Sequence, residues 1–375
     1  MTLRSNLPRA HSYKWKTHPA EILPLWVADM DYAPPEFLIK ELHAAVDEAD
    51  FGYTLAPDTF RTSVRDWIAR RHGFDLAESS VLPISGVVAG IVSALQCFGK
   101  PGSSYITLTP VYPLFLSAGN SAQMECLHAP LASKNGRYEI DFDALEKTIR
   151  PDTKAFLLSH PHNPSGRNFI KAELQEILKI CIKHDLVIIS DEIWSDWVLN
   201  DQPFIPFLSL GPEAEKRTVV FSSAGKTFNV PGLTAGYCLI ADPELRTKFA
   251  AHIRYLLPGA NDMGLRALVS LFKNGEPWLA EAKKMVRERL AFARREIAKS
   301  FPDFEMTNPE ASYLLWIDPK SHFGNDPFTK IFQDGKLALS DGKLFGKGGT
   351  GFIRMNVATT QENLEEALRR LKKSE

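Results

Sequence analysis

The stretch LVIISDE, residues 186–192, decides the fold class of this chain. Its first five residues form a short apolar run, which ends at two acids, Asp191 and Glu192. Such a run predicts a strand that is buried on both faces, as in a parallel sheet between helices. Similar runs occur at SYITL (104–108), KAFLLS (154–159), TVVFS (218–222) and AGYCLI (235–240). Longer amphipathic stretches alternate with these runs, so the sequence predicts an α/β fold with a mostly parallel sheet.

The pattern changes after about residue 262. Residues 263–300 favour helix throughout, and Asn274-Gly275 and Pro277 interrupt them, which predicts two consecutive helices. Strands at 312–317 and 351–357 and a helix at 360–372 predict a smaller α+β domain. Residues 1–40 are rich in proline and predict an extended arm rather than a packed unit. We therefore expect an arm that joins the small domain (1–40), a large domain (41–275) and a small C-terminal domain (276–375).

Composition narrows the class of protein. The 375 residues are 44% hydrophobic, which suffices for one large domain or two ordinary ones. The net charge of −1 indicates that the protein has no broad positive potential to attract nucleic acid. No apolar run approaches the roughly 20 residues of a membrane span, and the N-terminus has no signal core. We expect a cytoplasmic protein without nucleic-acid or membrane partners. The cysteines lack paired spacing and predict reduced thiols rather than a metal site: Cys97, Cys126, Cys181 and Cys238.

Two glycine motifs suggest phosphate-binding loops, but their surroundings do not fit. Gly225-Lys226-Thr227 would end a P-loop only with a glycine five residues earlier, and that position is Val220. The stretch GKGGTG (346–351) precedes a strand rather than a helix, so it predicts a glycine-rich turn and not a dinucleotide fingerprint.

Lys226 has a second interpretation, as a lysine that binds a cofactor covalently. It follows the small residues 222–225 at the carboxyl end of a buried strand, where open α/β sheets bind ligands. Desolvation there lowers the pKa of the amine and favours Schiff-base formation. Ser222 and Ser223 could donate hydrogen bonds to a phosphate. A solvated surface lysine is the alternative.

Three other segments strengthen this interpretation. Asp191 ends an apolar strand and needs a cationic partner, such as the protonated pyridine nitrogen of pyridoxal phosphate (PLP). Asn163 precedes a proline, which holds it extended and lets its amide face a ligand. Residues 85–90 open an apolar helix whose free amides suit a phosphate. A helix cap, an internal salt bridge or a plain turn are the alternatives.

In this order and spacing, the segments resemble the fold-type-I PLP enzymes, a superfamily that includes aspartate aminotransferase. The resemblance is closest to the cystathionine β-lyase-like C–S lyases. It covers essentially the whole chain and implies a PLP-dependent transferase fold with a seven-stranded-type sheet. Besides the lysine, its marks are LPLWVADMDY (23–32), FGYT (51–54), PVYPLF (110–115), PHNPSGR (161–167), SDEIWSD (190–196) and GFIRMNVA (351–358).

The resemblance assigns cofactor roles. Lys226 binds PLP and transfers the substrate's α-proton, Asp191 keeps the pyridine nitrogen protonated, and Asn163 contacts the phenolic oxygen. Tyr112 stacks on the face of the cofactor ring. The phosphate is bound by Ser222, Ser223 and the backbone amides of Val87 and Val88.

The resemblance also assigns substrate roles. Arg354 pairs with the amino-acid α-carboxylate, and the backbone of Ala28 adds a contact. Tyr53 reaches the phosphate in the other subunit, which implies a homodimer with shared active sites.

Three positions depart from the pattern of many aminotransferases. Thr234 stands where they have a phosphate-binding arginine, Trp194 where they have a tyrosine at the ring oxygen, and Gly225 where serine is common. The first two favour α,β-elimination from cystathionine or cysteine-type substrates, giving a thiol, pyruvate and ammonia. A class I/II aminotransferase on the same fold and a non-catalytic regulator are the other hypotheses.

Overall fold

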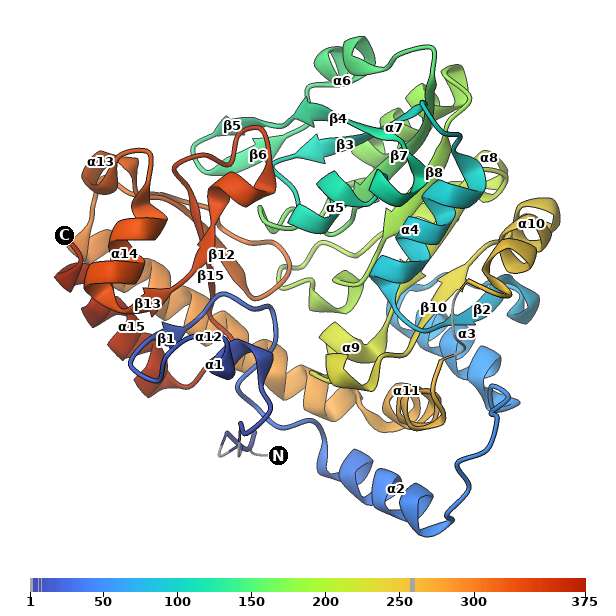
Figure 1. The fold of residues 1–375 in the computed structure, drawn as a ribbon, viewed down its shortest axis with the longest axis horizontal. Coiled ribbons are helices and arrows are strands. Elements are labelled where there is room, and N and C mark those ends of the chain that lie inside the picture. The colour runs from blue at the N-terminus through green and yellow to red at the C-terminus, as the bar shows by residue number, and fades with distance from the viewer. Residues whose placement is uncertain (1–2, 6, 8, 257–259) are drawn as a thin grey trace.

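A seven-stranded sheet forms the centre of the computed structural model, which describes residues 3–5, 7, 9–256 and 260–375 (Figure 1). β10 pairs antiparallel with both of its neighbours, and the other pairs are parallel. The predicted α/β fold with a mostly parallel sheet is confirmed. The strands run in the order β2 (Val81–Ile84), β10 (Gly236–Leu239), β9 (Thr218–Ser222), β8 (Val187–Asp191), β7 (Thr153–Ser159), β3 (Ser104–Thr109) and β4 (Glu125–Pro130).

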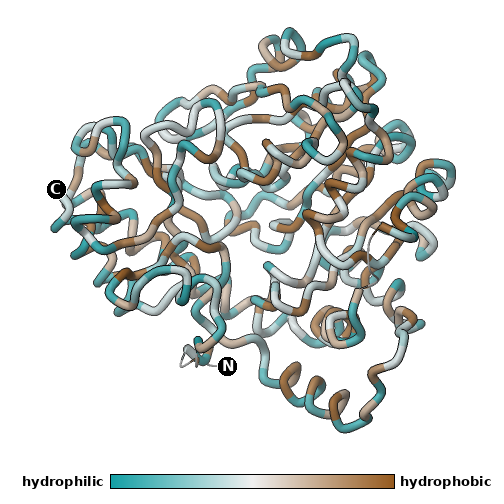
Figure 2. Tube along the Cα trace, in the orientation of Figure 1, coloured by the Kyte–Doolittle hydropathy of each residue, from teal (hydrophilic) through white to brown (hydrophobic). Residues whose placement is uncertain are grey.

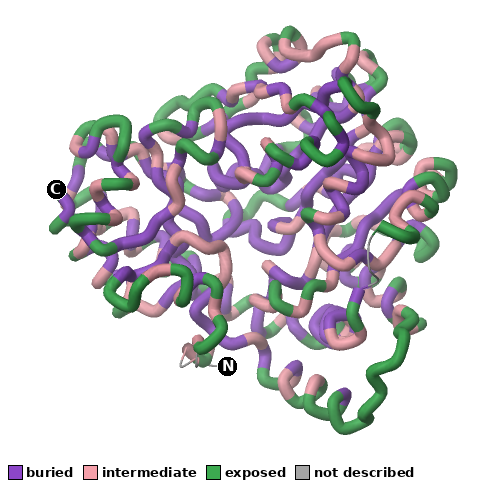
Figure 3. The backbone as a smooth tube through the Cα atoms, viewed as in Figure 1, coloured by how far each residue is buried: buried purple, intermediate pink, exposed green. Residues whose placement is uncertain are grey.

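Both faces of this sheet are buried, which explains the apolar runs. Along β7, Phe156 and Leu158 contribute to one core cluster, whereas Ala155 and Leu157 contribute to another. Successive side chains of a strand point to opposite faces, so one short run supplies both cores. Figure 2 shows apolar residues along the central strands, and Figure 3 shows the same strands buried beneath exposed outer loops.

Helices cover the two faces. The cluster on one face includes residues of α7 (Lys171–Lys183), and that on the other includes α4 (Val87–Phe98). No helix in the described part of the chain is long and apolar enough to cross a membrane. The remaining elements of this region are α2 (Glu36–Asp47), α3 (Thr59–His72), α5 (Pro113–Ser117), the hairpin β5 (Ala132–Lys134) and β6 (Arg137–Glu139), α6 (Phe142–Thr148), α8 (Pro212–Glu215), α9 (Ala224–Thr227) and α10 (Pro243–Ile253).

A second, four-stranded sheet lies towards the C-terminus (Figure 1). Two consecutive helices precede it, as predicted: α11 (Asp262–Asn274) and α12 (Glu276–Ser300). The domain boundaries at 40 and 275 stay predictions. In order, the sheet contains β11 (Glu305–Met306), β12 (Leu314–Asp318), β15 (Ile353–Asn356) and β14 (Ser340–Asp341), and α13 (Lys320–Phe323), α14 (Pro327–Gly335) and α15 (Gln361–Lys373) accompany it.

The N-terminal arm is extended but closely packed. It contains α1 (Tyr13–Lys16) and β1 (Leu23–Pro24), and β1 pairs in parallel with β13 (Leu337–Ala338). Leu25 and Tyr32 are buried in the core that the second sheet shares. The apolar residues of the arm thus fill that core, and the assignment of residues 1–40 to an arm that joins the small domain stays a prediction.

Candidate active site

A cavity of about 930 Å³ lies at the carboxyl ends of β7, β8 and β9, where a parallel sheet binds ligands. The arm and the second sheet close it from the other side. It gathers residues from across the sequence. Ten predicted site residues line it: Ala28, Val87, Val88, Tyr112, Asn163, Asp191, Trp194, Ser223, Lys226 and Arg354.

Hydrogen bonds hold both the backbone and the side-chain amine of Lys226. The backbone of α9 is capped by the Ser223 hydroxyl, which accepts from the Gly225 amide at 2.9 Å. The Trp197 indole donates to the Lys226 carbonyl at 2.8 Å. The amine Nζ donates to the Ala28 carbonyl at 2.6 Å. Burial lowers the pKa of Lys226 to about 8, so the neutral, nucleophilic amine is accessible near neutral pH.

Asp191 presents a carboxylate to the cavity without a cationic partner. It ends β8, and its Oδ1 accepts from the Ile193 amide at 3.0 Å. No lysine, arginine or histidine of the described chain forms an ion pair with it, and burial raises its pKa to about 7. The side chain of the next acid, Glu192, instead accepts a hydrogen bond from the Phe207 amide at 3.0 Å. Of the two acids, Asp191 is the one that lines the cavity, so it is the one to which a ligand could supply a cation.

Arg354 presents a buried guanidinium that no carboxylate neutralises within the described residues. Nη1 donates to Asn163 Oδ1 at 2.9 Å, and Nη2 donates to the Trp26 carbonyl at 3.0 Å and to Ser340 Oγ at 3.1 Å. Nε is buried and makes no hydrogen bond in the structure. An uncompensated buried charge is costly, so this geometry suits an anionic ligand group such as a carboxylate.

The start of α4 offers backbone donors to the same cavity. The first amide that bonds within this helix is that of Gly90, which reaches the Gly86 carbonyl at 3.0 Å. The amides of Val87 and Val88 precede it and have no intrahelical acceptor. Free amides at a helix N-terminus suit a phosphate.

Tyr112 and Trp194 supply flat walls to the cavity. Burial raises the pKa of Tyr112, which stays a neutral phenol at physiological pH. Trp194 packs edge-on against Tyr313 with ring centroids 4.8 Å apart. Its indole face also lies 5.8 Å from the Lys226 amine.

Two predicted site residues lie outside this cavity. The Ser222 hydroxyl donates to the Glu192 carbonyl at 3.3 Å and does not line the pocket. Tyr53 is fully exposed on the loop between α2 and α3. The structure therefore brings neither residue to the pocket of its own chain.

Several lining residues were not predicted as site residues. They come from the arm, α14, the end of β14 and the turn after it: Tyr13, His18, Trp26, Phe328, Asp341 and Leu344. Of these six residues, Trp26 alone lies within a motif that the sequence analysis used, LPLWVADMDY, two residues before the predicted Ala28.

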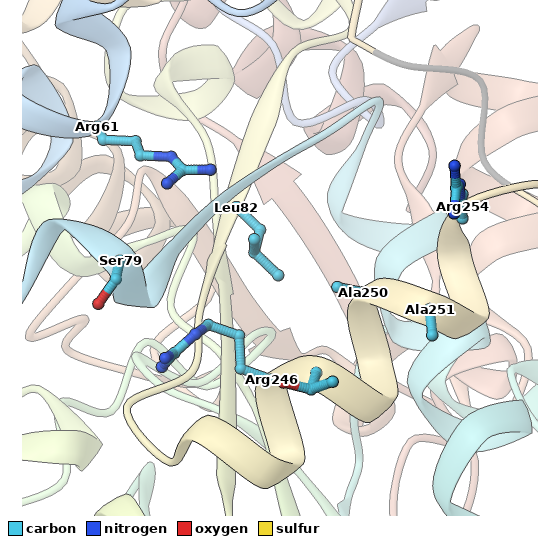
Figure 4. Close-up of a pocket in the computed structure, with 8 residues that line it drawn as sticks. Arg61, Ser79, Leu82, Arg246, Ala250, Ala251 and Arg254 are labelled. Carbon is cyan, nitrogen blue, oxygen red and sulfur yellow. The ribbon is translucent and has the colours of Figure 1, made fainter.

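A second hollow, of about 540 Å³, lies between α3 and α10 beside β2 (Figure 4). None of the predicted site residues is among the described residues that line it. Its arginines, Arg61, Arg246 and Arg254, point apart rather than towards a common point. Arg246 already donates to the Ile240 and Ala241 carbonyls at 2.9 Å. The hollow lacks the converging groups of the first cavity.

Comparison with known proteins identifies the family. Residues 20–371 match the family described as Aminotransferase class I and II. The chain belongs to the aminotransferase class I and II family. The resemblance predicted from the motifs is thereby confirmed.

Three similar proteins are informative. Cystathionine beta-lyase PatB of Bacillus subtilis (strain 168) is 34% identical over 94% of this chain and 92% of its own. The structure of cystalysin from Treponema denticola, which contains a pyridoxal 5'-phosphate cofactor, is 30% identical with a TM-score of 0.94, covering 100% and 98%. A PLP-bound putative aminotransferase from Clostridium difficile 630 is 33% identical with a TM-score of 0.94, covering 98% of both chains.

The residues of this class I and II site fit PLP. Asp191 lacks the cation that a pyridinium would supply, and the α4 amides lack the acceptor that a phosphate would supply. The partly neutral amine of Lys226 faces the same space. Each unsatisfied group thus corresponds to one part of the cofactor.

Proposed function

We propose that the protein is a PLP-dependent carbon–sulfur β-lyase. It cleaves the Cβ–S bond of a cysteine-type amino acid and yields a thiol, pyruvate and ammonia. The observation that carries this proposal is the juxtaposition of Lys226, Asp191 and Arg354 in one cavity. Similarity to a cystathionine beta-lyase over nearly the whole chain supports the reaction class.

Cofactor binding is assigned to polar groups that line the cavity. The amides of Val87 and Val88, with Ser223, hold the phosphate, and Asp191 pairs with the pyridine nitrogen. Tyr112 covers one ring face. When bound, PLP acts as an electron sink for the substrate's α-carbon. Ser222 stabilises the acidic strand end through Glu192 rather than touching the phosphate.

Substrate orientation is assigned to Arg354 and proton transfer to Lys226. Arg354 lines the cavity and would bind the α-carboxylate, the anion that its guanidinium lacks among the described residues. With the cofactor held in the cavity, the Lys226 amine would remove the substrate's α-proton onto Nζ. The Cβ–S electron pair then leaves with the sulfur as a thiolate. The unsaturated amino acid that remains hydrolyses to pyruvate and ammonia.

Transamination is the alternative on the same fold, and it shares the cofactor residues. Thr234 and Trp194 line the cavity in place of the arginine and tyrosine of many aminotransferases. The test is to supply L-cystathionine without any oxo acid and to measure pyruvate, ammonia and thiol. A lyase releases all three in equal amounts over many turnovers. An aminotransferase stops after one equivalent and forms no thiol.

We also propose a homodimer whose active sites are shared. The loop between α2 and α3 exposes a run of large apolar side chains, Phe51, Tyr53 and Leu55, which are 71%, 111% and 90% exposed. Such a run favours burial against a second copy, and Tyr53 then contacts the partner's phosphate site. Four free cysteines fit the reducing cytoplasm, where we place the protein.

A further inference from the structure

The mouth of the active-site cavity is lined by aromatic rings that the chemistry above does not use. We call Tyr13, His18, Trp26 and Phe328 the aromatic wall. The ring centroids of Tyr13 and Trp26 are 5.1 Å apart, and those of His18 and Trp26 are 5.6 Å apart. Phe332 supports the wall from behind, 5.2 Å from His18 and 5.8 Å from Phe328.

The wall is only partly covered although it is largely apolar. Tyr13 is 69% exposed, and two leucines of the same cavity, Leu114 and Leu344, are 42% and 61% exposed. Apolar groups gathered at the mouth of a ligand cavity gain free energy when a ligand covers them. The wall thus suits an apolar group at the outer end of the substrate.

Trp26 connects the wall to the carboxylate site. Its carbonyl accepts from Arg354 Nη2 at 3.0 Å, while its ring belongs to the wall. A substrate whose carboxylate pairs with Arg354 therefore has its side chain within reach of these rings.

The charges of the cavity argue against a second amino-acid group at the outer end. Among the described residues that line the cavity, the basic side chains are Lys226, Arg354 and His18. The first two serve the cofactor and the α-carboxylate, and His18 packs tilted against Trp26 and edge-on against Phe332. Asp341 adds a negative charge. Of the groups that one chain supplies, the distal carboxylate of cystathionine would meet rings and an acid rather than a guanidinium.

From this lining we infer that the preferred substrates are L-cysteine S-conjugates whose sulfur carries an aromatic or bulky apolar group. Cystathionine is then a poorer substrate. This inference rests on the proposed lyase function and names its substrate class.

The kinetic test compares S-benzyl-L-cysteine, S-methyl-L-cysteine and L-cystathionine by pyruvate release from the PLP-loaded protein. All three expel an alkyl thiol, so differences report mainly on binding. We expect kcat/KM for the benzyl conjugate to exceed the other two by about tenfold or more, as one buried ring allows. A value for cystathionine that equals or exceeds the benzyl value overturns the inference.

Variants localise the effect to the wall. Phe328→Ala should reduce the benzyl-to-methyl ratio of kcat/KM about tenfold, mainly through KM, and Tyr13→Ala, an exposed position, should act in the same direction. The control is Phe292→Ala on α12, an equally half-buried ring outside the cavity, which should leave the ratio unchanged. If Phe328→Ala and Tyr13→Ala lowered kcat/KM equally for all substrates, the proposed role of the aromatic wall would be contradicted.

Binding without turnover separates this inference from the proposed reaction. In PLP-treated Lys226→Ala protein, calorimetry should give a dissociation constant for S-benzyl-L-cysteine about tenfold below that for S-methyl-L-cysteine. If the wild type releases no pyruvate but the benzyl conjugate still binds more tightly than the methyl conjugate, the lyase proposal fails and the proposed role of the aromatic wall in binding stands. If pyruvate is released but the order is absent, only the wall fails.

Discussion

The amine of Lys226 donates a 2.6 Å hydrogen bond to the backbone carbonyl of Ala28, which lies 198 residues earlier in the chain. The Tyr313 hydroxyl donates to the same carbonyl at 3.1 Å. The packed N-terminal arm therefore forms part of the active site, and its stability is coupled to the position of the lysine.

Lys14 holds this arm in place. It is fully buried, and its Nζ lies 3.4 Å from Asp29 Oδ1 and 3.3 Å from Asp31 Oδ2. Lys14→Ala removes the nearest cation from the buried Asp31 and the partly exposed Asp29, while Arg9 stays 3.6 Å from Asp31. We expect it to lower the free energy of unfolding by about 2 kcal/mol in urea titrations. Lys40→Ala, which removes an exposed pair with Glu36, is the control and should cost less than about 0.5 kcal/mol. Equal effects of the two variants would contradict this role.

The lowered pKa of Lys226 predicts a pH dependence for cofactor uptake. Only the neutral amine attacks the cofactor's aldehyde, so uptake by cofactor-free protein should accelerate as pH rises through about 8. Stopped-flow absorbance between pH 6 and 10 measures this rate. A midpoint near 10.5, the ordinary value for a lysine, would show that burial does not perturb the amine in solution.

Arg354 should determine affinity for the amino-acid carboxylate. Arg354→Lys keeps the charge but loses the fork geometry, and we expect kcat/KM to fall by about 100-fold, mainly through KM. Arg61→Lys, in the second hollow, should change neither constant. Wild-type KM in Arg354→Lys would place the substrate carboxylate elsewhere.

Shared active sites predict rescue between defective subunits. Tyr53→Ala and Lys226→Ala homodimers should each be impaired, whereas a refolded mixture contains dimers with one intact site. Random mixing should restore activity to about a quarter of the wild type. Absence of rescue, with dimers present in size-exclusion chromatography, would place Tyr53 outside the site.

The sequence predicted those features that depend on local patterns. The run LVIISDE contains β8, and the interrupted helical stretch forms α11 and α12. A strand buried on both faces appears as a continuous apolar run, and a helix buried on one face appears as an amphipathic pattern, so both can be recognised from neighbouring residues. Helix α9 around Lys226 was not predicted, since its four residues depend on the Ser223 cap rather than on periodicity.

Features that depend on distant contacts could not be predicted. The β1–β13 pairing joins two-residue strands more than 300 positions apart. Arg354 and Asn163 were assigned to different ligands, yet they bond directly at 2.9 Å across 191 positions. The aromatic wall likewise appears only after the arm packs beside α14, because its rings have no common period in the sequence.

The most direct test compares wild-type and Lys226→Ala protein in one cuvette, with PLP and then S-benzyl-L-cysteine or L-cystathionine. We expect the wild type to show a visible band from PLP attached covalently to the protein before any amino acid is added, followed by sustained pyruvate release, and we expect neither from Lys226→Ala. Retention of both the band and pyruvate release by Lys226→Ala would contradict the central assignment of this lysine.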